Sequence, residues 1–178
     1  MEVIQTGLKG CVVIKADLHG DHRGFFLESF NKRAFKSFGI NFEVAQINFA
    51  KSSKNVLRGL HYQKEPMAQS KLVGVISGAV IDTVVDIRPN SETFLKNFQI
   101  KISDQATFLL VPKGFAHGYY TLEDDTVFYY AVDDFYSKEH EDGIRYNDPD
   151  LNIDWQLLDE PQVSEKDLNQ ELIKHIKF

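Results

Sequence analysis

The polar residues with the clearest potential for chemistry lie in the segment 55–63, Asn-Val-Leu-Arg-Gly-Leu-His-Tyr-Gln. Arg58 and His61 stand here within a segment that otherwise has the composition of a β-strand. Histidine suits proton transfer near neutral pH, and arginine suits a phosphate group. Residues three apart point to opposite faces of a regular strand, so both can face one site only if Gly59 introduces a β-bulge. The alternative is a paired arginine and a hydrogen-bonded structural histidine.

Two further segments supply a lysine and a second histidine. Lys71 stands at the start of an apolar run, where the simplest interpretation is a solvated lysine at a strand edge. His117 follows Pro112 and Gly114 into a strand-like run. This Pro-x-Gly-x-x-His spacing is similar to the second metal motif of cupins, which are β jelly rolls.

A cupin metal site would require further ligands from a first motif, His-x-His with a glutamate four or five residues later. Here Gln63 follows His61, and Met67 and Ala68 stand where the glutamate would be. One histidine from each motif without a carboxylate is a thin coordination sphere. The sequence therefore predicts a cupin-type barrel without the usual metal, which would act by proton transfer or by binding alone.

Strands would have to position these residues. Fourteen Phe and seven Tyr beside many Val and Ile favour strands over helices. Turn signals at 18–21, 77–78 and 147–149 separate short apolar runs. Many short strands with such turns predict a β-sandwich or barrel. The runs with strand character are 11–15, 24–30, 42–48, 72–76, 80–87, 98–102, 108–111 and 127–132.

Two helical segments are also predicted. Residues 32–38 could form a short helix capped by Asn31. Residues 164–167, Ser-Glu-Lys-Asp, resemble a capping box. The expected architecture is mostly β with short helices, including a C-terminal helical tail. The apolar residues expected to form the stripe of that tail are Leu168, Leu172, Ile173 and Ile176.

Composition and charge limit the class of protein. The 178 residues are 43% hydrophobic and 26% charged, which excludes disorder and low complexity and favours a single domain over residues 1–178. The net charge of −6 argues against a nucleic-acid partner. Cys11, the single cysteine, can form neither an intrachain disulfide nor a thiolate metal site. With no signal-peptide pattern and no apolar run near the ~20 residues that cross a bilayer, we expect a cytoplasmic protein without a membrane partner.

Many blocks of the sequence, in order and at matching spacing, resemble the dTDP-4-dehydrorhamnose 3,5-epimerase family over nearly the whole chain. The resemblance implies a cupin-type jelly roll that forms a homodimer, uses no cofactor, and acts on a nucleoside-diphosphate 4-keto-6-deoxy sugar. The blocks that carry it are 21–30, 55–63, 69–73, 85–88, 111–118, Tyr130 with Tyr136, 147–149 and 164–167.

The resemblance implies four catalytic roles. His61 matches the general base, and Asp167 matches the carboxylate that orients it. Lys71 matches the cation near the C4 oxygen of the sugar, and Tyr130 matches the general acid on the opposite face. Taken alone, Asp167 also fits the capping box, and Tyr130 also fits a core aromatic on a strand.

It also implies a set of binding residues. His117 matches a further active-site histidine, while Tyr136 and Lys166 fall at positions that line the site. In the family, part of the nucleotide pocket comes from the neighbouring subunit, near the segment that matches Phe25 and Phe26. The residues that match those binding the nucleotide, its diphosphate or the sugar are Arg23, Glu28, Gln46, Asn48 and Arg58.

The implied chemistry accounts for these residue types. C3 and C5 both flank the C4 carbonyl, so a base can remove either proton to form an enolate. A lysine can stabilise the negative oxygen of that enolate, and a tyrosine opposite the histidine can return a proton to the other face. We therefore expect inversion of C3 and C5 of a dTDP-linked 4-keto-6-deoxyhexose.

Departures from the family pattern keep other functions open. Ala131 follows Tyr130 where the family often has lysine, and Tyr146 stands where tryptophan is common. Such changes leave room for another sugar, another nucleotide, or a single-carbon epimerase acting at C3 or C5. The alternatives from other classes are a metal-binding cupin and a non-catalytic nucleotide-sugar binding module.

Overall fold

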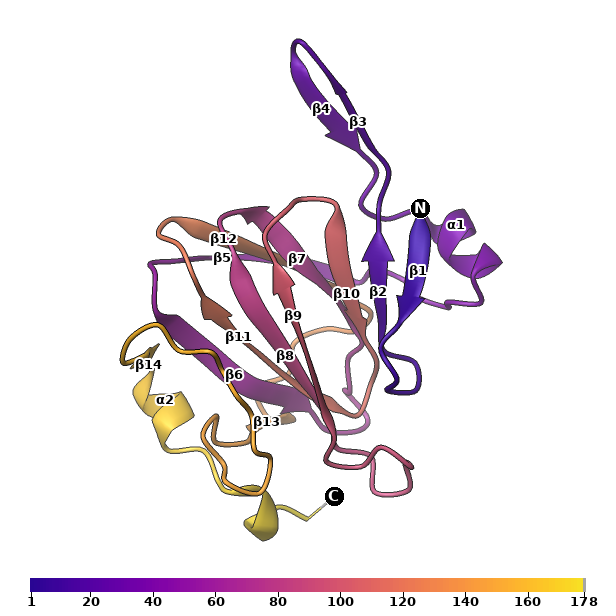
Figure 1. The fold of residues 1–178 in the computed structure, drawn as a ribbon. Helices are drawn as coiled ribbons and strands as arrows, with labels where there is room; N and C mark the ends of the chain where they lie inside the picture. Colours follow the sequence, from indigo (N-terminus) through magenta and orange to yellow (C-terminus); the bar gives the residue numbers. More distant parts are fainter. Residues whose placement is uncertain (178) are drawn as a thin grey trace.

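The computed structural model describes residues 1–177, which form two facing antiparallel β-sheets (Figure 1). The first, here called the β12 sheet, has the strand order β1 (Glu2–Gln5), β2 (Val12–Lys15), β10 (Thr107–Val111), β7 (Lys71–Ser77), β12 (Thr126–Val132) and β5 (Gln46–Ser52). The second, here called the β11 sheet, has the order β13 (Glu141–Gly143), β6 (Val56–Gln63), β11 (Phe115–Thr121), β8 (Val80–Asp86) and β9 (Asn97–Ile102). A short strand, β14 (Gln162–Val163), pairs with β6 in parallel. The predicted mostly-β architecture is confirmed.

The main core lies between the two sheets. It includes Val73 and Phe128 from the β12 sheet and Val84 and Phe115 from the β11 sheet, all at most 3% exposed. This core fills one part of the space between the sheets, so side chains elsewhere in that space can line a cavity.

The outer faces of both sheets are covered as well. Trp155 and Ile173 from the C-terminal segment pack with Leu57 against the β11 sheet. Phe35 and Phe42 pack against the β12 sheet. Strands such as β8 are therefore buried on both faces, and all seven of its residues are buried, including the polar Asp82, Thr83 and Asp86.

A two-stranded hairpin projects away from the sheets at the top of Figure 1. It consists of β3 (Leu18–Asp21) and β4 (Gly24–Leu27), which pair only with each other in the described chain. The sequence predicted a turn at 18–21, and this was wrong, because these four residues are exposed and gain strand structure only by pairing with β4.

Two other strand predictions differ from the structure. The segment 42–48 was predicted as one strand, but β5 begins only at Gln46 and continues to Ser52. Phe42 is buried in the outer core without belonging to a strand, so its apolar character reflects packing alone. The N-terminal strand β1 was not predicted; it forms an edge of its sheet by pairing with β2.

The first predicted helix forms as expected. Helix α1 (Lys32–Ser37) begins after Asn31, whose side-chain oxygen accepts hydrogen bonds from the amides of Arg33 at 3.0 Å and Ala34 at 3.1 Å. These bonds satisfy amides that have no partner within the helix, which is why asparagine favours this position.

The predicted C-terminal helix is only partly formed. Helix α2 (Glu165–Leu168) is capped by Ser164, but it ends after four residues, and a short 3₁₀ helix (Ile173–His175) follows separately. Between them, Glu171 forms a β-bridge with Ile144. The predicted apolar stripe was therefore wrong: Leu168 is 47% exposed, whereas Ile173 is buried. Pairing with another segment outweighed the local helical pattern.

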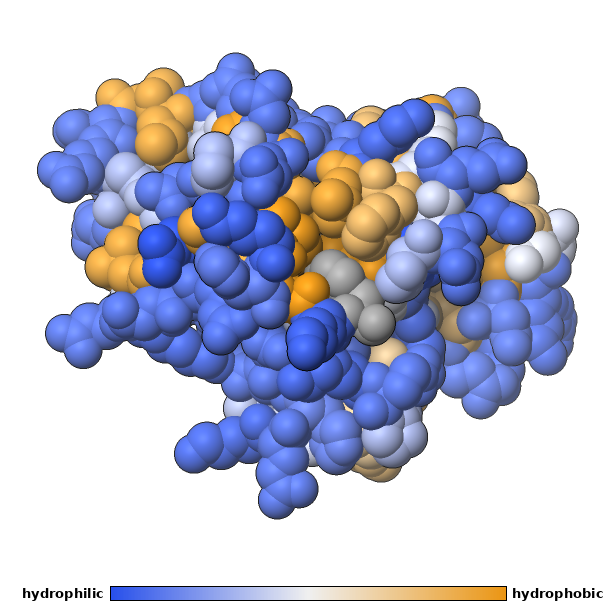
Figure 2. All heavy atoms as spheres, turned by 90° about the horizontal axis from the view of Figure 1, so that it is seen from below, coloured by the Kyte–Doolittle hydropathy of each residue, from blue (hydrophilic) through white to orange (hydrophobic). Residues whose placement is uncertain are grey.

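Hydrophilic side chains cover most of the face shown in Figure 2, and hydrophobic side chains gather in separate patches between them. Within residues 1–177, none of the helices has the length and apolar character needed to cross a membrane.

Candidate active site

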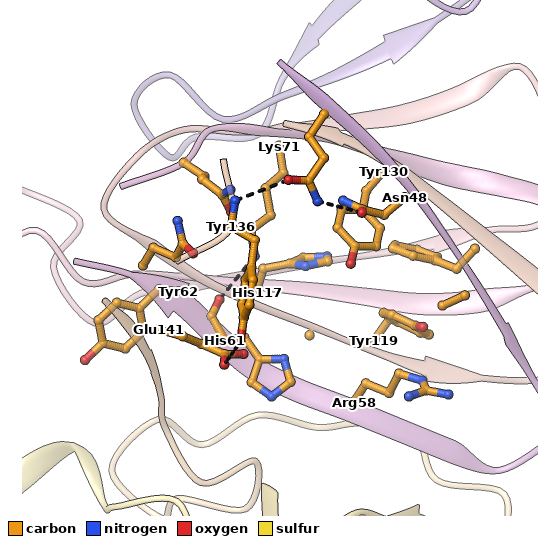
Figure 3. Close-up of a pocket in the computed structure, with 16 residues that line it drawn as sticks. Asn48, Arg58, His61, Tyr62, Lys71, His117, Tyr119, Tyr130, Tyr136 and Glu141 are labelled. Atoms are coloured by element: carbon orange, nitrogen blue, oxygen red, sulfur yellow. Dashed lines mark hydrogen bonds between the residues drawn. The ribbon is translucent and has the colours of Figure 1, made fainter. Parts of the chain in front are cut away.

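A cavity of about 420 Å³ lies between the sheets (Figure 3). Strands β6 and β11 supply one wall, and strands β5, β7 and β12 supply the other. Eight predicted site residues line it: Gln46, Asn48, Arg58, His61, Lys71, His117, Tyr130 and Tyr136. Residues as distant in sequence as Gln46 and Tyr136 thus share one cavity.

Arg58 and His61 face the same cavity because β6 contains a bulge. His117 pairs with His61 and Tyr119 pairs with Arg58, so two residues of β6 stand opposite one residue of β11. Gly59 adopts a φ of 126°, and a Cβ atom there would lie 2.5 Å from the Cα atom of Gly118. Glycine is therefore required at this close approach, and the bulge resolves the spacing problem in the sequence.

His61 forms a close pair with Asp167. The Nε2 atom of His61 lies 2.7 Å from Oδ1 of Asp167, whose other oxygen accepts a hydrogen bond from the amide of Gly59 at 3.2 Å. Burial opposes ionisation of Asp167, but the hydrogen bonds from His61 and Gly59 hold the pKa of this carboxyl below its usual value. An ionised carboxylate only accepts hydrogen bonds, so His61 presents Nε2–H to it and keeps the lone pair on Nδ1. That is the arrangement of an oriented general base.

Asp167 serves the helix as well as the histidine. Its amide donates to the side chain of Ser164 at 3.1 Å, as the capping-box pattern predicted. Its carboxylate lies in the buried interior, against β6. The two interpretations of Asp167 in the sequence are therefore compatible.

A second histidine–carboxylate pair lies on the same wall. Nε2 of His117 lies 2.9 Å from Oδ2 of Asp82, a fully buried residue of β8. The other oxygen of Asp82 has no hydrogen-bond partner among residues 1–177. Asp82 was not predicted as a site residue, although a carboxylate between the valines and isoleucine of a buried strand is a signal, because buried charges need partners.

Lys71 projects into the cavity from β7. Burial lowers the pKa of its amine to about 8, although the negative charges of Asp82 and Glu141 oppose that shift. Its Nζ atom donates to the carbonyl of His61 at 3.5 Å. The ammonium form is thus close to neutralisation at slightly alkaline pH, which makes it sensitive to any negative charge that develops nearby.

Of the four tyrosines that line the cavity, Tyr130 and Tyr136 differ in the hydrogen bonding of their hydroxyl groups. Burial raises the pKa of Tyr130, and within residues 1–177 its hydroxyl has no hydrogen-bond partner. The hydroxyl of Tyr136 donates to Oε2 of Glu141 at 2.9 Å. Tyr130 comes from the β12 sheet and His61 from the β11 sheet, so they lie on opposite walls of the cavity (Figure 3).

The predicted binding residues divide into two groups. Gln46 and Asn48 lie on β5 and are hydrogen-bonded to each other at 2.7 Å, within the cavity. Arg23, Phe26 and Glu28 lie on or beside the projecting hairpin and do not line the cavity. Within one chain, the structure does not bring this second group to the first.

Lys166 also lies outside the cavity lining. It pairs with Glu141 at 2.6 Å and contributes to the site only through that residue. Glu141 was not predicted as a site residue, because nothing in its local sequence distinguishes it from an acidic residue on the surface. The other lining residues that were not predicted are Ala50, Tyr62, Gln63, Gln69, Gly118, Tyr119 and Phe128.

Residues 1–177 contain no group of three or more His, Cys, Asp or Glu side chains that could hold a metal ion. The two cavity histidines are each engaged by a carboxylate through Nε2. The residues present therefore offer oriented imidazoles, one lysine and tyrosine hydroxyls.

Comparison with known proteins identifies the family. The model of the family described as dTDP-4-dehydrorhamnose 3,5-epimerase matches residues 5–175. The chain belongs to this family. The resemblance found in the sequence blocks is thereby confirmed.

Individual relatives cover almost the whole chain. The dTDP-4-dehydrorhamnose 3,5-epimerase of Shigella flexneri is 44% identical over 171 residues, which cover 95% of this chain and 94% of that protein. A crystal structure of dTDP-6-deoxy-D-glucose-3,5-epimerase from Legionella pneumophila, in complex with dTDP-4-keto-L-rhamnose, superposes with a TM-score of 0.94 at 41% identity, covering 99% of this chain and 94% of that one. The predicted cupin-type jelly roll is confirmed by this agreement.

A less similar protein has the same fold but a different named activity. A 3'-monoepimerase from Streptomyces bikiniensis, in complex with dTDP-quinovose, has a TM-score of 0.90 at 32% identity and covers 96% of this chain and 87% of that one. Family enzymes with different numbers of inverted carbons thus share this fold, and the fold alone does not set that number.

Proposed function

We propose that this protein is an isomerase that inverts C3 and C5 of a dTDP-linked 4-keto-6-deoxyhexose. One observation carries the proposal: the His61–Asp167 pair faces Tyr130 across the cavity that also receives Lys71. The named activities of the family relatives support the same reaction.

In the proposed mechanism, Nδ1 of His61 removes the proton from C5 or C3, and the electron pair of that C–H bond moves to the C4 oxygen as an enolate. Asp167 stabilises the imidazolium that results, and Lys71 stabilises the enolate oxygen. Tyr130 then gives its proton to the same carbon from the opposite wall, which inverts that centre. Proton exchange with water returns both side chains to their starting forms.

The test is to incubate dTDP-4-keto-6-deoxyglucose with the purified protein in heavy water. The sugar nucleotide is then transferred to ordinary water, and its mass is measured by mass spectrometry. Once the protein has been removed, carbon-bound deuterons survive that return, so two enzyme-dependent deuterons support deprotonation at both C3 and C5, and NMR of the product then reports the configuration of each carbon. One deuteron would instead favour the single-carbon epimerase, the activity named for the Streptomyces relative. No incorporation would refute the proposed substrate.

Replacement of Tyr130 by phenylalanine separates deprotonation from inversion. The base pair remains, so the substrate is still deprotonated, but the deuteron returns from His61 to the original face. We expect deuterium in the recovered substrate with inversion reduced about 100-fold, within the range of general-acid catalysis. Mass spectrometry measures exchange and NMR measures configuration. Equal losses of exchange and inversion would contradict the role of Tyr130 as the proton donor.

We also include a homodimer in the proposal, with each cavity completed by the hairpin of the neighbouring subunit. Phe25 and Phe26 on this hairpin are 54% and 68% exposed, as expected of side chains that pack against a partner. The side chain of Arg23 is 78% exposed and pairs with Asp21 of the same hairpin at 2.5 Å, so a diphosphate would bind there by sharing or displacing that carboxylate.

Mixed subunits test this arrangement. In a dimer of one His61→Ala and one Arg23→Ala subunit, one cavity holds the intact His61 of its own chain and the intact Arg23 of the other. Random mixing therefore restores about one quarter of the cavities, measured as turnover at low substrate concentration. A mixture no more active than the separate variants would rule out a shared cavity.

A further inference from the structure

Glu141 lines the cavity but has no role in the proposed mechanism. Within residues 1–177 it is the only carboxylate that lines the cavity, and its side chain is 18% exposed. Its Oε2 atom accepts from the hydroxyl of Tyr136 at 2.9 Å and pairs with Nζ of Lys166 at 2.6 Å (Figure 3 shows the first contact). A negative charge there repels a diphosphate substrate, so its presence calls for a physical reason.

The contact with Lys166 connects Glu141 to the helix that carries Asp167. Helix α2 has only four residues and cannot be stable without tertiary contacts. Two consecutive side chains hold it: Asp167 contacts His61 on β6, and Lys166 contacts Glu141 on β13. Because β13 pairs directly with β6, the two anchors attach α2 to neighbouring strands of one sheet.

The contact with Tyr136 affects the choice of proton donor. The hydrogen bond to Glu141 raises the pKa of Tyr136, and burial and the carboxylate charge act in the same direction. A hydroxyl whose proton is held by a carboxylate is a poor donor to an enolate. The hydroxyl of Tyr130, in contrast, has no such partner within the described chain.

We propose that Glu141 is a positioning residue, which anchors helix α2 so that Asp167 stays against His61, and which holds the Tyr136 proton away from the sugar. This inference rests on the proposed epimerase function. It adds to it a residue that acts through Asp167, His61 and Tyr136 without touching the reacting carbons.

The charge of Glu141 gives the inference a pH signature. The titratable groups that face this carboxylate are Lys166 of α2, Tyr136 of the loop after β12, His61 of β6, Lys71 of β7 and Tyr130 of β12. Its negative charge favours the ammonium form of Lys71 and so opposes the lowering of that pKa by burial. Loss of the charge therefore lowers the pKa of Lys71 further. The decline of activity at alkaline pH should then begin at a lower pH.

The experiment compares Glu141→Gln, Glu141→Asp and Asp125→Asn with the parent enzyme. For Glu141→Gln we expect kcat to fall about tenfold with KM changed less than about twofold, as for a lost hydrogen bond to a charged group. The alkaline limb of its kcat/KM profile should move to lower pH. Glu141→Asp keeps the charge, so its alkaline limb should stay near that of the parent. Asp125→Asn removes a carboxylate–lysine pair in the turn before β12, 2.6 Å from Lys51 and outside the cavity lining, and should match the parent throughout.

Lys166→Met provides an independent variant, useful also if Glu141→Gln does not fold. It removes the anchor but keeps the carboxylate, so kcat should fall while the alkaline limb stays at or above the parental pH. An active parent with a Glu141→Gln variant of unchanged kcat and unchanged alkaline limb would overturn the role of Glu141 alone. A parent that incorporates no deuterium would overturn the proposed function, and with it this inference.

Discussion

Replacing His61 by alanine is expected to lower substrate deprotonation about 10³-fold, within the range that general-base catalysis contributes. The reason is geometric: Asp167 fixes the ring through Nε2, and the side chain of His61 is 29% exposed, whereas that of His117, the other cavity histidine, is only 8% exposed. Without this base, neither C3 nor C5 can lose its proton to the protein.

Deuterium incorporation from heavy water measures this directly, because it counts deprotonation whether or not the carbon is inverted. Affinity for dTDP, measured by calorimetry, should be nearly unchanged, since the proposed nucleotide contacts are made by other residues. His175→Ala is a matched control, because that exposed histidine lies on the C-terminal 3₁₀ helix, outside the cavity. Exchange at the parental rate in the His61 variant would show that another group is the base.

Replacing Lys71 by methionine is expected to lower kcat about 10²- to 10³-fold, the typical effect of removing one donor to an oxyanion. Methionine preserves much of the side-chain volume but supplies no charge for the enolate oxygen. Because the charge that needs stabilisation appears only as the proton leaves, turnover should fall more than substrate affinity.

The pH profile gives a second, independent signature of Lys71. Burial lowers the pKa of its amine to about 8, and only the ammonium form stabilises the enolate. The parent kcat/KM should therefore decline as the pH rises through about 8. In Lys71→Arg the cation stays protonated, so that decline should disappear while part of the activity remains. A Lys71→Arg profile with the same alkaline decline would assign it to a different group.

The residues of these two predictions were identified from the sequence, whereas two other carboxylates of the site were not. His61 and Lys71 stand in polar segments that attract attention, and the family resemblance gave each a role. Asp82 and Glu141 were not predicted, since the sequence around a carboxylate on a strand does not indicate which distant side chain it will contact. Their partners, His117 and Lys166, are 35 and 25 positions away in the sequence.

Local signals predicted local structure well where no distant segment competed. Asn31 caps α1, and Ser164 caps α2, as their side chains and spacing indicated. The helical stripe expected after residue 168 did not form, because Glu171 forms a β-bridge with Ile144 and its backbone is therefore not helical. Short helices depend on tertiary packing, so their length cannot be read from periodicity alone.

The sequence by itself determined a mostly-β cupin-type chain, its family, and the chemical types of the groups for a proton-transfer site. Only the tertiary structure decided that Arg58 and His61 share a face, through the bulge at Gly59, and that Asp167 meets His61 across 106 positions of sequence. The physical reason is that residue type and local spacing fix backbone preferences and side-chain chemistry. Which distant side chains meet is fixed by strand register and by the packing of two sheets.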